Sequence, residues 1–223
     1  MEYAPADEFL TKREVATRRL RDAIRLGRYA PGDPLKQNDI AADLGLSSTP
    51  VREALTELRA CGLVVYESHR GARVATIDVA RVRELYTARK IVERETARLA
   101  FENIGKAELA HIRGTYDALA RWDGGGDYET LVRRDEDFHL SLYEASGNAY
   151  LIRSIRDLWH SFPRYFMWNI EGRLAQSKTE HRRIMSALRK RDRTRFLESV
   201  EAHIDCSLNA IVAHIEANAP LGP

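Results

Sequence analysis

The sequence lacks the features of a membrane-spanning, secreted or disulfide-bonded protein. No apolar run reaches the roughly 18 residues that a membrane helix needs. The opening residues, MEYAPADEF, have neither the basic stretch nor the apolar stretch of a secretory signal. Cys61 and Cys206 lie far apart in the sequence, with no paired spacing for zinc or redox chemistry. We therefore expect a cytoplasmic protein with two reduced cysteines and no membrane partner.

An excess of basic residues is also missing. The chain of 223 residues has 35 Lys/Arg and 33 Asp/Glu, a net charge of +2. Residues 1–78 contain 12 of each kind, so this part is not a polycation. If it binds DNA, it must do so through a few cations that face the duplex. The length and the 44% hydrophobic content predict two small domains, each with a packed core.

Three short helices are predicted in the N-terminal third of the chain. Apolar spacing predicts a helix over 9–26 and a second helix over 38–44. A third helix begins at STPVRE, where Ser48 or Thr49 can cap the free amides. Pro50 fits the first turn of this helix because its missing N–H costs nothing there.

The third helix and the segment after it have the arrangement of a DNA-reading unit, in which a helix with an exposed polar face is followed by a β-hairpin. The apolar stripe of this helix leaves Ser48, Arg52 and Arg59 together on the opposite face. The β-rich runs LVVYES and ARVATI, joined by HRG, predict a two-stranded hairpin with a basic tip. The helix could enter a DNA groove while the hairpin contacts the DNA backbone beside it. The alternative is a solvated helix face followed by an ordinary turn.

From Asp78 onward the pattern is helical and gives no strand signal. The predicted fold class is therefore mainly α, with a small DNA-reading unit followed by an all-α helical bundle. The six predicted helices of the bundle span 79–102, 106–121, 128–145, 149–168 with a kink near Pro163, 177–190 and 192–217.

Four polar residues interrupt the apolar stripes of these helices. Asp135 and His139 are spaced i, i+4 on the inward side of one helix, and His181 and His203 lie on the apolar stripes of two others. Burying them without partners would cost several kcal/mol. They must therefore satisfy one another by hydrogen bonds or share a divalent metal such as Zn, Ni, Mn or Fe. An open position on such a metal would attract a small carboxylate.

Other polar residues near these positions are weaker candidates. Glu136, spaced i, i+3 from His139, is a weaker substitute for Asp135 as a ligand. His111, His160 and His214 fall off the apolar stripes and are predicted at the surface or flanks.

The chain resembles the GntR family of bacterial transcription regulators. The residues IRLGRYAPGDPL, DIAADLGLSSTPVREALTELRACGLV and RGARV are similar to the winged helix-turn-helix of that family. DEDFHLSLYEASGN, EHRRIMSALRKRD and EAHI are similar to the effector domain of its FCD, or FadR-like, branch. The resemblance covers about residues 10–215. It implies a winged helix-turn-helix domain of three helices and a two-stranded wing over 8–77, and an FCD-type effector-binding and dimerisation domain over 78–218.

The resemblance implies which residues face DNA. The third helix would lie in the major groove and the wing along the minor groove. Arg52 could then reach a guanine edge or a phosphate. The family usually has Arg where this chain has Ser48, so a contact at that position would be shortened or lost. The DNA-binding residues expected on this basis are Asn38, Ser48, Thr49, Arg52, Arg59, His69, Arg70 and Gly71.

The resemblance also bears on the polar positions of the bundle. Many FCD domains bind a metal at the positions of Asp135, His139, His181 and His203. Arg89 resembles a family arginine that faces the pocket and could pair with a carboxylate effector. The alternative for Arg89 is an i, i+4 ion pair with the glutamate of the same helix, on the helix surface.

Together these features predict a DNA-binding transcription regulator, a repressor in most such families, and not an enzyme. A small organic acid bound at the metal would control the affinity for double-stranded operator DNA. A homodimer would read an inverted repeat, and surplus apolar surface on 79–102 and 149–168, including Trp159 and Trp168, would join its subunits. The alternatives are a metal-dependent enzyme that uses the three-histidine, one-aspartate site to activate water, and a DNA-binding protein with a purely structural metal.

Overall fold

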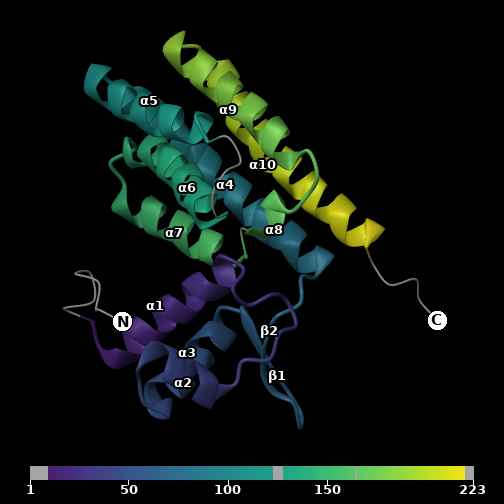
Figure 1. Ribbon diagram of the computed structural model, residues 1–223. Coiled ribbons are helices and arrows are strands. Elements are labelled where there is room, and N and C mark those ends of the chain that lie inside the picture. Colours follow the sequence, from purple (N-terminus) through teal and green to yellow (C-terminus); the bar gives the residue numbers. More distant parts are fainter. Residues whose placement is uncertain (1–9, 123–127, 164, 219–223) are drawn as a thin grey trace. The chain divides into compact units, whose positions relative to one another are not determined.

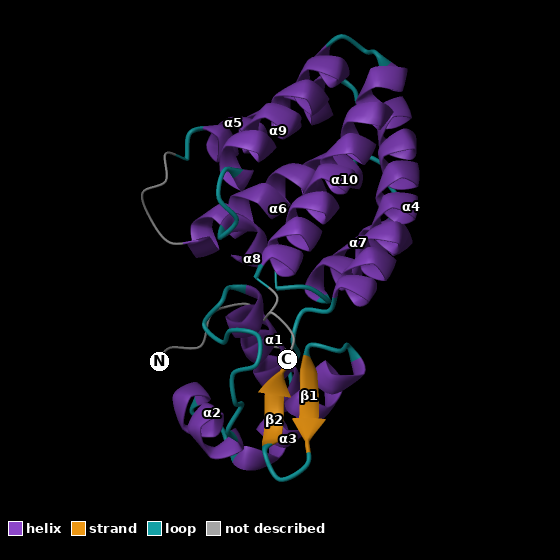
Figure 2. Cartoon of the chain, turned by 90° about the vertical axis from the view of Figure 1, so that its right-hand side faces the viewer, coloured by secondary structure: helices purple, strands orange, loops and turns teal. Residues whose placement is uncertain are grey.

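The computed structural model describes residues 10–122, 128–163 and 165–218 (Figure 1). The chain divides into two compact units. The first comprises the residues up to Ile77 together with His160–Pro163, and the second comprises Asp78–Trp159 and the residues from Arg164 onward. The fold is mainly α, as predicted, and its one described sheet has two strands (Figure 2).

The first unit contains three helices and the two-stranded sheet. A capping box fixes the start of the first helix, because the Thr11 amide donates to Glu14 (2.8 Å) and the Glu14 amide donates to the Thr11 hydroxyl (3.3 Å). The start predicted at residue 9 lies outside the described residues. The elements are α1 (Lys12–Arg25), α2 (Gln37–Leu44), α3 (Ser48–Ala60), β1 (Val64–Glu67) and β2 (Gly71–Val74).

The start of α3 differs by one residue from the prediction. The residue that precedes the helix is Ser47, not Ser48 or Thr49, and its side chain makes no capping hydrogen bond. Pro50 lies in the first turn and is buried. The helix nevertheless presents the predicted stripe, and its buried side chains pack with those of α1, α2 and both strands in one core. Packing of this stripe, rather than its cap, therefore holds α3 in place.

The sheet forms the wing. Strands β1 and β2 are antiparallel, with Val64 paired with Val74 and Glu67 with Gly71. The turn between them places His69 (φ 63°) and Gly71 (φ 76°) in the left-handed region. Glycine adopts this conformation freely, whereas histidine does so at some cost. The wing tip is thus a tight turn that exposes basic side chains.

The second unit is a helical bundle. Helix α10 packs against both α4 and α9, and α5 packs against α6. Figure 1 shows α9 and α10 side by side along most of their lengths. The helices are α4 (Val79–Asn103), α5 (Lys106–Ala120), α6 (Tyr128–Glu144), α7 (Ala149–His160), α8 (Tyr165–Trp168), α9 (Arg173–Arg189) and α10 (Arg193–Ala217).

Three predictions for the bundle were wrong in detail. The segment 149–168 is two helices rather than one kinked helix, because the chain leaves the helix before Pro163, whose ring cannot continue it. Helix α9 begins at Arg173, four residues before the predicted 177, after Gly172 with φ 74°. The aromatic side chains of Trp159 and Trp168 are buried within the chain and cannot supply a dimer surface.

Candidate metal centre

Four polar side chains from three helices meet inside the bundle. Asp135 and His139 lie one turn apart on α6, His181 lies on α9, and His203 lies on α10. All four are buried, with exposed fractions between 1% and 7%. The apolar stripes of these helices include Phe138, whose ring packs against His139 and His181 at 5.0 Å. The polar groups therefore occupy the centre of the core and not its edge.

The ring nitrogens of the three histidines face a common point. The Nε2 atoms of His139 and His181 are 3.1 Å apart, and one ring nitrogen from each histidine lies within 4.8 Å of the others. The Asp135 carboxylate lies 3.7 Å from His139 Nε2 and 3.6 Å from His181 Nε2. Two imidazole nitrogens this close share either a proton or a cation.

These separations fit a metal ion. Two ligand atoms that each lie about 2.1 Å from one ion at a tetrahedral angle are about 3.4 Å apart. The separations among His139, His181 and Asp135, which are 3.1, 3.6 and 3.7 Å, bracket that value. Imidazole nitrogen and carboxylate oxygen are ligands that suit Zn, Ni, Mn and Fe. The residues present could therefore hold one divalent ion with small shifts.

His203 is held by a buried carboxylate. Its Nδ1 lies 2.7 Å from Glu180 Oε2, so Nε2 is the ring nitrogen that could bind a metal. Arg173 donates to both oxygens of Glu180 at 3.1 and 2.9 Å and to the hydroxyl of Ser207 at 2.7 Å. A carboxylate on the far nitrogen of a ligating histidine fixes the tautomer and orientation of the ring and raises its basicity.

Arg89 lies in a second buried network. Its Nε donates to Glu93 at 2.7 Å, and Glu93 also accepts from the Tyr143 hydroxyl and the Trp159 indole, both at 2.9 Å. Burial alone would lower the pKa of Arg89, but the electrostatic effects of Glu93 and Tyr86 outweigh it and hold the pKa above its ordinary value. The predicted pair with Glu93 exists, but it is buried in the bundle, not on the helix surface.

The two networks flank the histidines. The His139 ring stacks near Tyr143 at 6.4 Å and meets Trp159 edge-on at 6.2 Å. It also stacks on His203 at 4.8 Å. A shift of His139 would therefore alter its contacts with Tyr143 and Trp159, which both donate hydrogen bonds to Glu93.

Sequence reasoning missed several residues of these networks. The predicted start of α9 at residue 177 leaves Arg173 outside the helix, although it lies at the first position of the helix. Glu180 and Ser177 are not among the predicted site residues, although their spacing from Arg173 keeps all three on the buried face of α9. Ser177 lies 3.4 Å from His181 Nε2. Polar residues at the spacing of Arg173, Ser177 and Glu180, on the apolar stripe of a helix, indicate a buried polar network.

The weaker candidates lie away from the buried group. His111 is exposed, and Glu136 and His214 are half-buried. The group of three histidines that could hold a metal comprises His139, His181 and His203.

Comparison with known proteins settles the family. The profile of the FCD domain matches residues 84–205, more than half of the chain. The profile described as bacterial regulatory proteins, gntR family, matches residues 12–74. The chain belongs to the FCD branch of the GntR family. FCD domains are known to bind metal ions.

Relatives of this GntR-family chain are transcription regulators. It is 36% identical to the "probable D-xylose utilization operon transcriptional repressor" of Paenarthrobacter nicotinovorans over 65% of each chain. It is 28% identical to the "Nta operon transcriptional regulator" of Aminobacter aminovorans over 82% of this chain and 88% of that one. Among solved structures, McbR/YncC of E. coli shares the fold, with a TM-score of 0.79 at 21% identity over 92% and 99% of the two chains.

These matches establish a DNA-binding transcription regulator rather than an enzyme. The alternative of a metal-dependent hydrolytic site is therefore not favoured. Within the described part of the chain, no helix has both the length and the apolar character of a membrane span.

The DNA-binding residues expected for a GntR regulator all belong to the first unit and are exposed. Arg59 lies over the Tyr66 ring of β1 at 5.6 Å, and Arg70 pairs with Glu67 at 3.7 Å. These contacts orient the side chains of Arg59 and Arg70 against residues of β1. The exposed residues of the set are Asn38, Ser48 and Thr49, Arg52 and Arg59 on α3, and His69, Arg70 and Gly71 at the wing tip.

Loss of Glu180 should destabilise the bundle. Glu180→Ala leaves the guanidinium of Arg173 buried without its carboxylate, which should lower the free energy of unfolding by about 3–5 kcal/mol. Urea denaturation in a chelating buffer measures this cost independently of any metal. Glu198→Ala, an exposed glutamate of α10, is the matched control and should change stability by less than about 0.5 kcal/mol. Equal losses in the two variants would contradict the buried ion pair.

Proposed function

We propose that the bundle of this regulator binds one divalent metal ion through Asp135, His139, His181 and His203, and that a small carboxylate bound there controls operator affinity. The observation that carries the proposal is the convergence of three buried ring nitrogens, all within 4.8 Å of one another, beside a buried carboxylate. In water each of these groups would be solvated, so each needs a partner when it is buried, and one ion could serve all four at once.

The charge of the interior supports a cation. Among the described residues of the second unit, the buried side chains that ordinarily carry full charge are Arg89, Glu93, Asp135, Arg173 and Glu180. Three carboxylates and two guanidinium groups leave one negative charge, and neutral histidines do not change it. A divalent ion would convert this to one positive charge. The site would then favour an anionic ligand, which could bind as a further ligand because such ions can expand beyond four-coordination.

Arg89 would provide the second contact to such a ligand. Its Nε donates to Glu93, but a guanidinium has five N–H donors. Donors on the two Nη atoms could pair with a carboxylate that also reaches the metal. Because Glu93 already compensates the charge of Arg89, the arginine can remain buried and charged before the ligand arrives.

Ligand binding would reach the DNA-binding unit through α4. This helix carries Arg89 and Glu93, and it begins at Val79, five residues after the last residue of the wing. A ligand that binds better to one position of α4 would favour the matching arrangement of the DNA-binding units. A homodimer would read an inverted repeat with two such units. Relatives named as repressors support repression as the output.

Metal binding should stabilise the bundle. Zinc at a thousandfold excess over its dissociation constant should add about 4 kcal/mol to the free energy of unfolding, and a chelator should remove it. His181→Ala should reduce the metal content measured by elemental analysis, abolish the effect of small carboxylates on DNA binding, and leave DNA binding itself intact.

His111→Ala, which removes an exposed histidine of α5, is the control and should keep the metal. Equal metal content in His181→Ala and the parent, or a melting curve unchanged by Zn²⁺, Ni²⁺ and Mn²⁺, would leave the four residues as a hydrogen-bonded polar cluster. Metal binding without any carboxylate effect would instead indicate a purely structural ion.

Arg52 should contribute directly to operator affinity. Arg52→Ala should weaken binding by about 1–3 kcal/mol, because it removes one guanidinium contact from an exposed helix face. Arg59→Ala should cost less, since Arg59 lies two turns further along α3 and packs over Tyr66. Fluorescence anisotropy at fixed salt, with an operator selected from random duplexes, measures the difference. Glu53→Ala on the same exposed face should not weaken binding, and equal affinities for Arg52→Ala and the parent would refute the assignment.

The chain should be a dimer in solution, with the outer face of α4 at the interface. Ile91 on α4 is 67% exposed, so it is available to become buried in such an interface. Ile91→Glu should raise the dimer dissociation constant at least about tenfold, because it replaces an apolar contact by a charge. Sedimentation velocity measures this. Val65→Glu on the wing, where Val65 is 37% exposed, should leave the dimer intact. A monomeric parent at micromolar concentration would overturn the prediction.

A further inference from the structure

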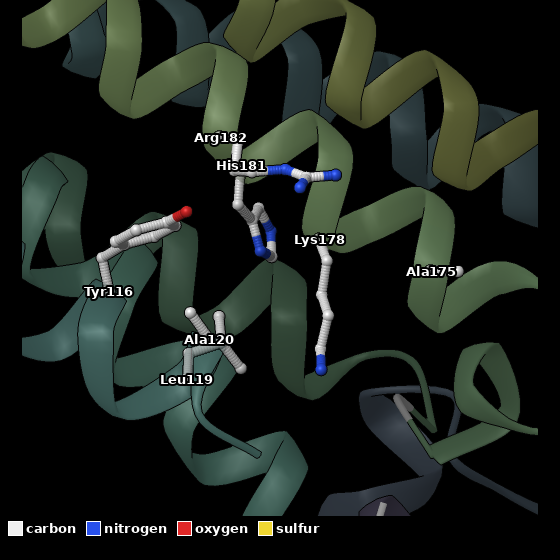
Figure 3. Close-up of a pocket in the computed structure, with 7 residues that line it drawn as sticks. All are labelled: Tyr116, Leu119, Ala120, Ala175, Lys178, His181 and Arg182. Atoms are coloured by element: carbon white, nitrogen blue, oxygen red, sulfur yellow. The ribbon is translucent and has the colours of Figure 1, made fainter. Parts of the chain in front are cut away.

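A pocket opens between α5 and α9 beside the histidine group (Figure 3). Its volume is about 290 Å³, which is at the small end of ligand pockets and suits a metabolite. The residues that line it are Tyr116, Leu119 and Ala120 of α5, and Ala175, Lys178, His181 and Arg182 of α9.

His181 belongs to both the pocket and the candidate metal centre. Its ring forms part of the pocket wall, while its Nε2 lies 3.1 Å from His139 Nε2 and 3.6 Å from the Asp135 carboxylate. Figure 3 shows the Tyr116 ring on the α5 side and the His181 ring on the α9 side of the pocket. A molecule in the pocket would therefore lie against a residue of the metal centre.

The pocket has the chemistry of an anion site. Lys178 and Arg182 are one helical turn apart, and among the described residues that line the pocket none is acidic. The Lys178 ammonium donates to the Trp122 carbonyl at 2.6 Å, and Arg182 donates to the Thr179 hydroxyl at 2.8 Å. An ammonium has three donors and a guanidinium has five, so both side chains keep donors for a ligand. Leu119, Ala120 and Ala175 add a short apolar surface.

We propose that this pocket holds the second carboxylate of a dicarboxylic effector, with Lys178 and Arg182 as its partners. The inference rests on the proposed function, in which the first carboxylate of the same ligand binds at the metal. The short aliphatic chain of the ligand would lie along Leu119, Ala120 and Ala175. The pocket would thus select dicarboxylic over monocarboxylic acids, because only the former can bind at the metal and at these two cations together.

The test compares aliphatic acids with and without a second carboxylate. The full chain loaded with zinc is titrated by calorimetry with the aliphatic dicarboxylates from malonate to adipate and with butyrate. At least one dicarboxylate should bind about tenfold tighter than butyrate, as one further charge-assisted hydrogen-bonded pair predicts. In Lys178→Gln/Arg182→Gln this advantage should disappear, with butyrate affinity unchanged.

Arg183→Gln is the matched control, because Arg183 is exposed on the same helix beside Arg182 and does not line this pocket. It should retain the preference of the parent. Each variant is first checked for parental zinc content and an unchanged unfolding transition. If the double variant does not fold, Lys178→Gln and Arg182→Gln are tested singly, and each should lose part of the preference.

The outcomes separate this inference from the proposed function. If all the acids bind only in the presence of zinc but the dicarboxylates have no advantage, or keep it in the double variant, the pocket inference is wrong and the metal-centred function stands. If no acid binds in a zinc-dependent way, the proposed function fails, and the inference fails with it. A preference lost in the double variant and kept in Arg183→Gln supports the pocket.

Discussion

The cost of burying charge without a partner is the constraint on which the bundle depends. Helical packing would place apolar residues at the centre of such a domain, yet this chain has carboxylates, guanidinium groups and imidazoles there. Each must be paired by hydrogen bonds of good geometry, because one uncompensated charge would cost several kcal/mol. The helices therefore cannot slide past one another freely. Their registers are limited to those in which the polar groups meet.

The buried pairs connect helices that are distant in sequence. Glu93 of α4 accepts hydrogen bonds from Tyr143 of α6 and Trp159 of α7, and Arg173 of α9 donates to Ser207 of α10. Apolar contacts tolerate small displacements, whereas these bonds are directional. A shift at the histidines would need to be accommodated by the networks on either side. This is the physical basis on which a ligand at the centre could alter α4.

Much of the fold and part of the site could be predicted from sequence, because the signals were local. Helix periodicity located α4, α5, α6 and α10 to within a few residues, and the spacing of Asp135 and His139 placed both on one buried face. The spacing of Arg173, Ser177 and Glu180 could indicate a buried face, but it could not identify the partners of Glu180. Arg173 lies before the predicted start of the helix, and His203 lies on another helix. The partners of Glu93 lie 50 and 66 residues away, and only tertiary packing brings them together.

The three hydrogen bonds that Glu93 accepts also limit which substitutions can be tolerated at this position during evolution. Glu93 cannot be replaced alone. Its loss would leave the buried Arg89 and the donors of Tyr143 and Trp159 without their acceptor. Substitutions tolerated here must come in pairs, with Arg89 losing its charge as Glu93 loses its own. In an alignment of relatives, these two positions should therefore change together or not at all, and Tyr143 should follow them.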